Sequence, residues 1–127
     1  MSRSFVVTGG ARGVGRAIAE RLAEDGAVVV VDSAAVDGLG SGIKAIAGDA
    51  SDDAVLGRAV QIASSGGTLS GWVNNAAVFR DAALHTAPSR EVVELIAENL
   101  ALAVAGSGAA ILRFLADGTA GAIVNVS

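Results

Sequence analysis

A glycine-rich turn between an apolar segment and a helical pattern constrains the fold of this chain more than any other feature. The turn lies within SFVVTGGARGVG at residues 4–15. Gly9 permits a tight turn, Gly13 permits close approach of the main chain to an anion, and Gly15 lets the helix pack against the strand. The N-terminus of that helix directs free N–H groups at the same place. The segment therefore predicts a strand, a pyrophosphate-binding turn and a helix.

The residues after the turn support this interpretation. The glycines alone would be weak evidence, because 17 of the 127 residues are glycine. Apolar residues at i, i+3, i+4 and i+8 predict one buried helical face. The run AVVVV at residues 27–31 predicts a buried parallel strand, and Asp32 follows it about 20 residues after the glycines, where a ribose-binding acid is expected. A structural strand-turn-helix with a surface aspartate is the alternative. The predicted helical face consists of Val14, Ala17, Ile18 and Leu22.

The composition excludes several classes of site. The chain has no cysteine and one histidine, so it can form neither a disulfide nor a thiolate metal site, and we expect no metal site. His85 is interpreted as a polar loop residue. The net charge of −4 argues against a nucleic-acid partner, because phosphate backbones are bound by basic surfaces.

Length and sequence pattern favour one soluble domain over residues 1–127. A chain of this length can bury roughly two-thirds of its unfolded surface. No signal-peptide pattern precedes the first strand, and the longest uncharged apolar stretch, residues 99–112, is too short to cross a bilayer. We therefore expect a cytoplasmic protein with no membrane partner.

The rest of the chain alternates strand and helix patterns. Residues 33–42 lack a helical period, which predicts a loop or single turn in place of the usual crossover helix. Ser51 and Asp52 are N-cap candidates for a second helix, and Pro88 predicts the start of a long helix over residues 89–116. The alternation predicts an α/β fold with a doubly wound parallel sheet. Further strands are predicted at residues 43–47, 69–73 and 122–126.

Three motifs stand in the order found in a known family. TGGARGVG at residues 8–15 matches TGxxxGxG, NNAA at residues 74–77 is similar to NNAG, and AIVNVS at residues 122–127 resembles the strand that leads to a catalytic serine. Over essentially its whole length the chain resembles the short-chain dehydrogenases/reductases. The resemblance implies a Rossmann-type sheet with strand order 3-2-1-4-5, an NAD(P) cofactor, and hydride transfer between nicotinamide and an alcohol or carbonyl substrate.

The same resemblance implies which residues contact the cofactor. Asp49 looks like the family's adenine-contacting acid, and an N-terminal helix cap is its alternative role. Asn75 follows a central strand, where open α/β sheets place their ligands. Ala77 replaces the glycine of NNAG, which matters only if the backbone there needs a positive φ. The implied cofactor-binding residues are Gly9, Ala11, Arg12, Gly13, Val14, Gly15, Asp32, Ser33, Asp49, Ala50, Asn75, Ala76 and Ala77.

Asn99 matches the family's helical catalytic asparagine, which orders a water in a proton relay. A mid-helix asparagine that faces solvent is the alternative. The helix is apolar nearly all round, and a polar residue in such surroundings is costly unless it has a partner. We therefore expect Asn99 to be buried and functional. Its apolar neighbours are Leu95, Ile96, Leu100 and Leu102.

The choice between the two nicotinamide dinucleotides depends on charge. Asp32 can accept hydrogen bonds from a ribose 2′,3′-diol, whereas it would repel a 2′-phosphate. Arg12 argues the other way, since a basic residue in the turn can pair with a 2′-phosphate. Ser33 stands where NADP-using relatives often have arginine. We therefore expect NAD rather than NADP.

The family's acid–base residues are absent. The resemblance implies a serine, a tyrosine and a lysine four residues after the tyrosine, but the chain contains no tyrosine and its one lysine is Lys44. By the family pattern the serine falls one position after Ser127. We therefore expect the fold to be truncated after its fifth strand and the chain to supply the cofactor-binding half of an NAD-dependent oxidoreductase.

Two alternatives belong to other classes of function. One is a non-catalytic dinucleotide-binding or oligomerising protein. The other is an S-adenosylmethionine-dependent methyltransferase, which also has glycines after its first strand and an acid after its second. The longer glycine spacing and the pair Asn74 and Asn75 disfavour the methyltransferase.

The long helix and the last strand predict an interface. A helix over residues 89–116 cannot bury its whole circumference against one sheet, and a strand at residues 122–126 would leave an apolar edge. We expect these surfaces to contact a second subunit or a missing C-terminal segment.

Overall fold

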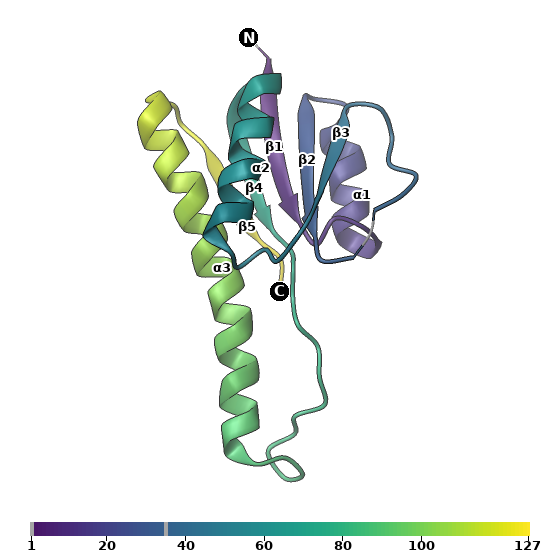
Figure 1. Ribbon diagram of the computed structural model, residues 1–127, viewed down its shortest axis with the longest axis vertical. Coiled ribbons are helices and arrows are strands. Elements are labelled where there is room, and N and C mark those ends of the chain that lie inside the picture. The colour runs from purple at the N-terminus through teal and green to yellow at the C-terminus, as the bar shows by residue number, and fades with distance from the viewer. Residues whose placement is uncertain (1, 35) are drawn as a thin grey trace.

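The computed structural model describes residues 2–34 and 36–127, and a parallel sheet of five strands forms its centre (Figure 1). The strands lie in the order β3-β2-β1-β4-β5, and each neighbouring pair is parallel. This confirms the predicted Rossmann-type fold and its strand order. The strands are β1 (Arg3–Thr8), β2 (Ala27–Asp32), β3 (Ile43–Ala47), β4 (Thr68–Asn74) and β5 (Ala122–Asn125).

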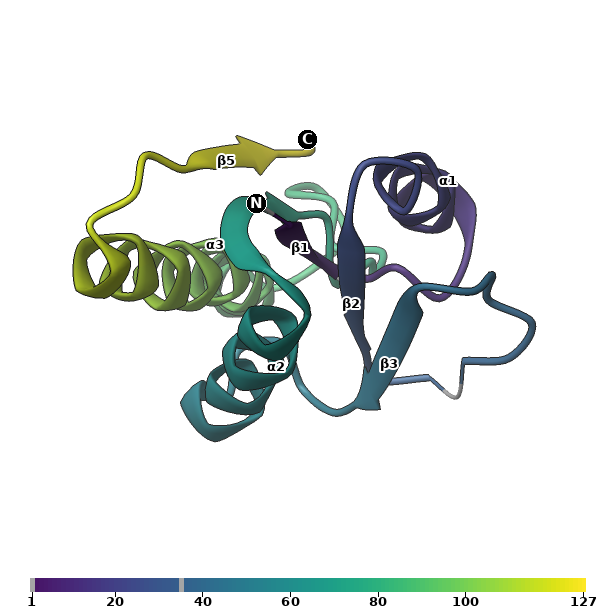
Figure 2. The same cartoon turned by 90° about the horizontal axis from the view of Figure 1, so that it is seen from above.

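Helices cover the sheet on both faces. Helix α1 (Gly13–Leu22) lies on one face, and α2 (Asp53–Gly66) and α3 (Ser89–Asp117) lie on the other (Figure 2). The Asp52 side chain caps α2 by accepting hydrogen bonds from two N–H groups of its first turn, as the sequence predicts. Residues 33, 34 and 36–42 form only bends and turns, which agrees with the predicted loss of a crossover helix.

The central strands are buried because both of their faces are covered. The four valines of β2 are at most 2% exposed, which accounts for the uninterrupted apolar run in the sequence. Trp72 of β4 packs with Leu56 of α2 and Phe114 of α3 in the core on one face. Phe5 and Val73 belong to the core on the α1 face.

A buried asparagine joins the sheet to its longest helix. The Asn74 Oδ1 atom accepts a hydrogen bond from Trp72 Nε1 at 2.9 Å, and Asn74 Nδ2 donates to Ser107 Oγ at 3.1 Å and to Asn125 Oδ1 at 2.9 Å. These bonds connect β4 with α3 and β5. Helix α3 comes this close because residue 106 is glycine: a Cβ atom there would overlap Asn74 Oδ1 and lie 2.8 Å from Trp72 Nε1.

Only part of α3 is covered by the rest of the chain. Its C-terminal half packs on β4 through Gly106, Ala110 and Phe114, whereas its N-terminal half extends beyond the sheet together with residues 75–88 (Figure 1). By length and composition alone α3 is apolar enough to cross a membrane, with a mean hydropathy of 1.7 over its most apolar window. The expectation that no part of the chain is long enough to cross a bilayer was based on the uncharged stretch at residues 99–112, and it does not hold for the whole of α3.

The buried face of α1 agrees with the predicted one only in part, because Ile18 and Leu22 pack against the core whereas Val14 and Ala17 do not. Val14 is 62% exposed and Ala17 is also exposed, whereas Gly15 and Ala19 are buried. The helix is turned in this way because it approaches the glycine turn at Gly15, where a Cβ atom would overlap the carbonyl oxygen of Gly9. Close backbone approach therefore overrides the hydrophobic pattern at the start of this helix, at Val14 and Ala17.

Candidate functional site

Three adjacent strands end at the same edge of the sheet, and the segments after them form the candidate site. The glycine turn follows β1, Asp32 ends β2, and Asn75 follows β4. Strands β2, β1 and β4 are neighbours and run parallel, so their carboxyl ends lie together. This is the edge at which open α/β sheets hold their ligands.

The glycine turn is fixed to both neighbouring strands. Gly9 has a φ of +67°, and its N–H donates to the Val31 carbonyl at 2.7 Å. The Asn75 Nδ2 atom donates to the Gly9 carbonyl at 3.0 Å. Gly13 has a φ of +62°, and a Cβ atom there would meet nothing within 4 Å. The turn is thus held on its inner side and open at Gly13.

The N-terminus of α1 offers hydrogen-bond donors at this opening. Arg12 precedes the helix with an extended backbone and makes no side-chain cap, and the first turn contains no acidic residue. The first N–H groups of the helix therefore lack a side-chain partner. Arg12 and Val14 are both exposed beside them, and no ion pair joins Arg12 to a carboxylate in the described residues. Such donors at a helix N-terminus suit a phosphate group.

Thr8 holds the turn after β4 against the turn after β1. Its hydroxyl oxygen accepts hydrogen bonds from the N–H groups of Asn75 and Ala76, both at 3.1 Å, and donates to the Val73 carbonyl at 3.4 Å. This threonine was not predicted as a site residue. The available sequence signal was a polar residue between the apolar run FVV at residues 5–7 and the glycine turn.

The Asp32 carboxylate lies between the glycine turn and the loop after β2. Its Oδ2 atom accepts a hydrogen bond from the Ala11 N–H at 3.0 Å, and its Oδ1 atom accepts one from the Ala34 N–H at 2.9 Å. Asp32 is partly exposed, and Ser33 beside it is exposed. Each carboxylate oxygen has two lone pairs, so both atoms can accept a further hydrogen bond from a ligand.

Asp49 follows β3 at the same edge and does not cap a helix. Its Oδ1 atom accepts hydrogen bonds from the Ser51 hydroxyl at 2.7 Å and the Ser51 N–H at 2.8 Å, which lower the pKa of the Asp49 carboxyl. The cap of α2 is Asp52, so the alternative role considered for Asp49 is wrong. The side chain of Ala50 is buried in the core, which leaves only its backbone to face a ligand.

The alanine that replaces a motif glycine fits the structure without strain. None of the described residues other than glycine has a positive φ, so Ala77 adopts an ordinary backbone conformation. Ala76 packs partly against the core, and Ala77 is exposed. The departure from NNAG therefore does not distort this end of β4.

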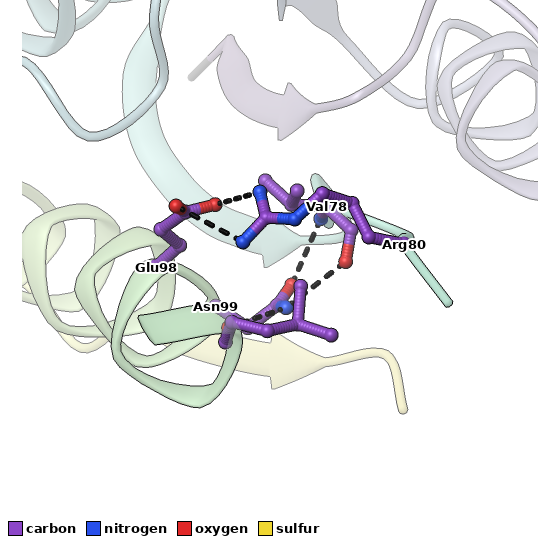
Figure 3. Close-up of polar contacts among 5 residues, drawn as sticks. Val78, Arg80, Glu98 and Asn99 are labelled. Atoms are coloured by element: carbon purple, nitrogen blue, oxygen red, sulfur yellow. Dashed lines mark hydrogen bonds and ion pairs between the residues drawn. The ribbon is translucent and has the colours of Figure 1, made fainter. Parts of the chain in front are cut away.

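Asn99 of α3 holds the segment that follows β4 (Figure 3). Its Oδ1 atom accepts a hydrogen bond from the Val78 N–H at 2.9 Å, and its Nδ2 atom donates to the Val78 and Leu95 carbonyls, both at 3.0 Å. Next to it, the Arg80 guanidinium binds the Glu98 carboxylate at 2.8 Å, a bond that raises the pKa of Arg80 above its usual value. Two successive helix residues therefore fix the path of this segment.

The surroundings of Asn99 differ from the expected buried environment. Ile96 and Leu100 are each more than 60% exposed, and Asn99 itself is half-buried. The expectation of apolar burial is therefore wrong, although the expected polar partners are present.

The other candidate residues lie at the surface. Lys44 of β3 is exposed, and so is His85 in the segment before α3. Within residues 2–34 and 36–127, no group of three or more His, Asp or Glu side chains is placed to hold a metal ion.

Comparison with known proteins gives one consistent family. The family model described as short chain dehydrogenase matches residues 3–127. The chain is 33% identical to carbonyl reductase family member 4 of Danio rerio, over 99% of this chain and 56% of that protein. It is 32% identical to the 3-oxoacyl-(acyl-carrier-protein) reductase FabG of Chlamydia muridarum, over 100% of this chain and 56% of that protein. The chain thus spans about half the length of the curated relatives it matches.

Proposed function

The chain belongs to the short-chain dehydrogenase family, and from this we propose that it supplies the dinucleotide-binding half of an NAD-dependent oxidoreductase. The family is one of oxidoreductases that use NAD(P). When bound, the nicotinamide supplies or accepts the hydride exchanged with an alcohol or carbonyl carbon. We assign residues 1–127 to the N-terminal, cofactor-binding portion of such an enzyme.

The glycine turn and the start of α1 carry this proposal. The N–H groups at the start of α1 have no side-chain cap, and the open side of Gly13 leaves room for a phosphate beside them. Asp32 ends the neighbouring strand with a carboxylate that two backbone amides already hold in place. A diphosphate and an adjoining ribose need these two features side by side. We assign adenine contact to Asp49.

The same geometry supports NAD over NADP. The fixed negative charge of Asp32 favours two ribose hydroxyls and disfavours a 2′-phosphate in the same position. Arg12 offers a positive charge next to Ala11, but its side chain is exposed and makes no cap at the start of α1. We give the carboxylate the greater weight because it is held in place and the arginine is not.

A fluorescence titration with NADH and NADPH tests the proposal. We expect the wild-type protein to bind NADH more tightly, and we expect Asp32→Asn to lose roughly tenfold of that preference. The amide removes the charge and keeps an acceptor oxygen for one of the two backbone N–H groups that Asp32 binds, whereas Asp32→Ala removes the charge and both acceptors. Asp37→Asn is the matched control, since it removes an exposed carboxylate from the same loop. Failure of the wild-type protein to bind either dinucleotide would contradict the proposal.

The acid–base chemistry of the proposed enzyme comes from residues outside these 127. The chain has no tyrosine, and Lys44 lies exposed on β3. We propose that Asn99 acts as a positioning residue, because it already binds both backbone groups of Val78 and so sets the course of the chain beside the site. The substrate is proposed as a small alcohol or carbonyl compound.

The exposed apolar side of α3 and the edge strand β5 support a self-association proposal. Val93, Ile96, Leu100 and Val104 are each more than 60% exposed, and Val124 of β5 is 52% exposed. We propose that a second copy of the chain covers these residues. Sedimentation at micromolar concentration should show a species larger than the monomer, and Leu100→Glu should shift it towards the monomer. Arg90→Glu, at the exposed start of the same helix, is the control. A monomeric wild-type protein would mean that another segment covers this surface.

A non-catalytic dinucleotide-binding protein is the second candidate, and the absence of tyrosine favours it. Such a protein would give the same result in the NADH and NADPH titration, but it would not catalyse hydride transfer. The methyltransferase alternative is excluded by the family match.

A further inference from the structure

The loop between β2 and β3 begins at the proposed ribose-binding acid and has no helix in its described part. Residues 33, 34 and 36–42 follow Asp32 directly. Val36 and Leu39 are partly buried against the core beneath α1, while the other described residues of the loop are largely exposed. Such a segment needs further contacts if it is to hold one conformation next to a ligand.

Arg16 of α1 supplies those contacts. Its Nη2 atom donates to the Gly38 carbonyl at 2.6 Å, and its Nη1 atom donates to the Asp37 carbonyl at 3.2 Å and to the Ala11 carbonyl at 3.4 Å. Its Nε atom donates to Glu20 Oε1 at 3.1 Å, which orients the guanidinium plane. One side chain therefore binds the loop and the glycine turn together.

The backbone conformation at residue 38 favours glycine, and its carbonyl is the one that Arg16 Nη2 contacts. Gly38 has a φ of +69°, a conformation that glycine adopts without strain, and a Cβ atom there would lie 3.4 Å from Arg16 Nη2. The planar guanidinium has five donors in a fixed arrangement, so it can reach several carbonyls at once. A lysine ammonium is a compact point charge on a flexible stem and does not reproduce this arrangement.

Arg16 and Asp32 bind the same two segments through opposite groups. Asp32 accepts from the N–H of Ala11 in the turn and from the N–H of Ala34 in the loop. Arg16 donates to the C=O of that same Ala11 and to the loop carbonyls of Asp37 and Gly38. The peptide groups on both sides of Ala11 are therefore held, and the carboxylate orientation depends on a loop that Arg16 fixes.

We propose that Arg16 is a positioning residue for dinucleotide selection: it fixes the loop after β2 against the glycine turn and thereby holds the Asp32 carboxylate in the orientation that selects the ribose. The inference rests on the proposed function, because it assigns the selected group to the ribose of a nicotinamide dinucleotide.

Two measurements on Arg16→Met and Arg16→Lys test the inference. Hydrogen exchange followed by NMR should show the amides of Ala11 and of the loop residue Ala34, which both donate to Asp32, exchanging roughly tenfold faster in Arg16→Met, since Arg16 no longer holds the segments that carry them. Fluorescence titration should show a roughly tenfold weaker NADH affinity and a reduced preference for NADH over NADPH. We expect Arg16→Lys to recover little of either property.

Arg21→Met is the matched control. Arg21 lies on the same helix and, among the residues that the structure describes, forms ion pairs only with Glu24 and Asp25, so its loss should leave loop exchange and dinucleotide preference unchanged. Exchange in β1 and β2 reports whether each variant is folded.

The outcomes separate the inference from the proposed function. Unchanged loop exchange in Arg16→Met would overturn the inference, and so would faster exchange with unaltered affinity and preference. A wild-type protein that binds neither dinucleotide would overturn the proposed function and the selective role of Arg16 with it. Loop exchange would then still show whether Arg16 fixes the loop.

Discussion

Replacing Gly106 by alanine is expected to lower the free energy of unfolding by about 2 kcal/mol, although alanine is the better helix former. The added Cβ atom would overlap Asn74 Oδ1 and crowd Trp72 Nε1, so α3 would have to move away from β4. That movement would break the hydrogen bonds by which Asn74 joins β4, α3 and β5. Chemical denaturation followed by circular dichroism measures the change.

Gly108 provides a matched control on the same helix. A Cβ atom there would meet nothing within 4 Å, so Gly108→Ala should raise the free energy of unfolding by about 0.5–1 kcal/mol. The two substitutions are chemically identical and two residues apart, yet the expected effects have opposite signs. Equal stabilisation by both would contradict the close packing described for Gly106.

Thr8→Val should destabilise the protein by about 2–3 kcal/mol and weaken dinucleotide binding. Valine has nearly the shape of threonine, but it leaves the N–H groups of Asn75 and Ala76 without their acceptor, and each lost partner costs about 1–3 kcal/mol when the donor is buried. Binding should suffer because the glycine turn and the end of β4 are held together at this hydroxyl. Thermal unfolding and NADH titration are the measurements.

Thr8→Ser tests the cause of that effect. Serine keeps the hydroxyl and loses one methyl group in a fully packed strand, so we expect a loss of about 1 kcal/mol and near-normal NADH affinity. If serine and valine have equal effects, packing rather than hydrogen bonding explains the role of Thr8.

Local sequence signals were sufficient for the elements and their order. The valine run of β2, the N-cap at Asp52 and the proline before α3 each act within a few residues, and the structure confirms the segments that they predict. The glycine spacing identified the turn because the required backbone conformations at Gly9 and Gly13 are local too. The family match confirms the family to which these signals pointed.

Long-range contacts account for what the sequence did not predict. The Asn99 side chain bonds both backbone groups of Val78, which lies 21 residues away. Helical periodicity cannot show that Arg16 reaches a loop 21 and 22 residues further on. Such contacts exist only once the sheet has brought distant segments together.

Trp72 is the only tryptophan in the chain, so tryptophan fluorescence reports on this one position. Trp72 is inaccessible to solvent, and its ring nitrogen is bonded to the asparagine that also binds α3 and β5. Its emission should therefore shift to longer wavelength when either of those elements detaches, without any attached dye.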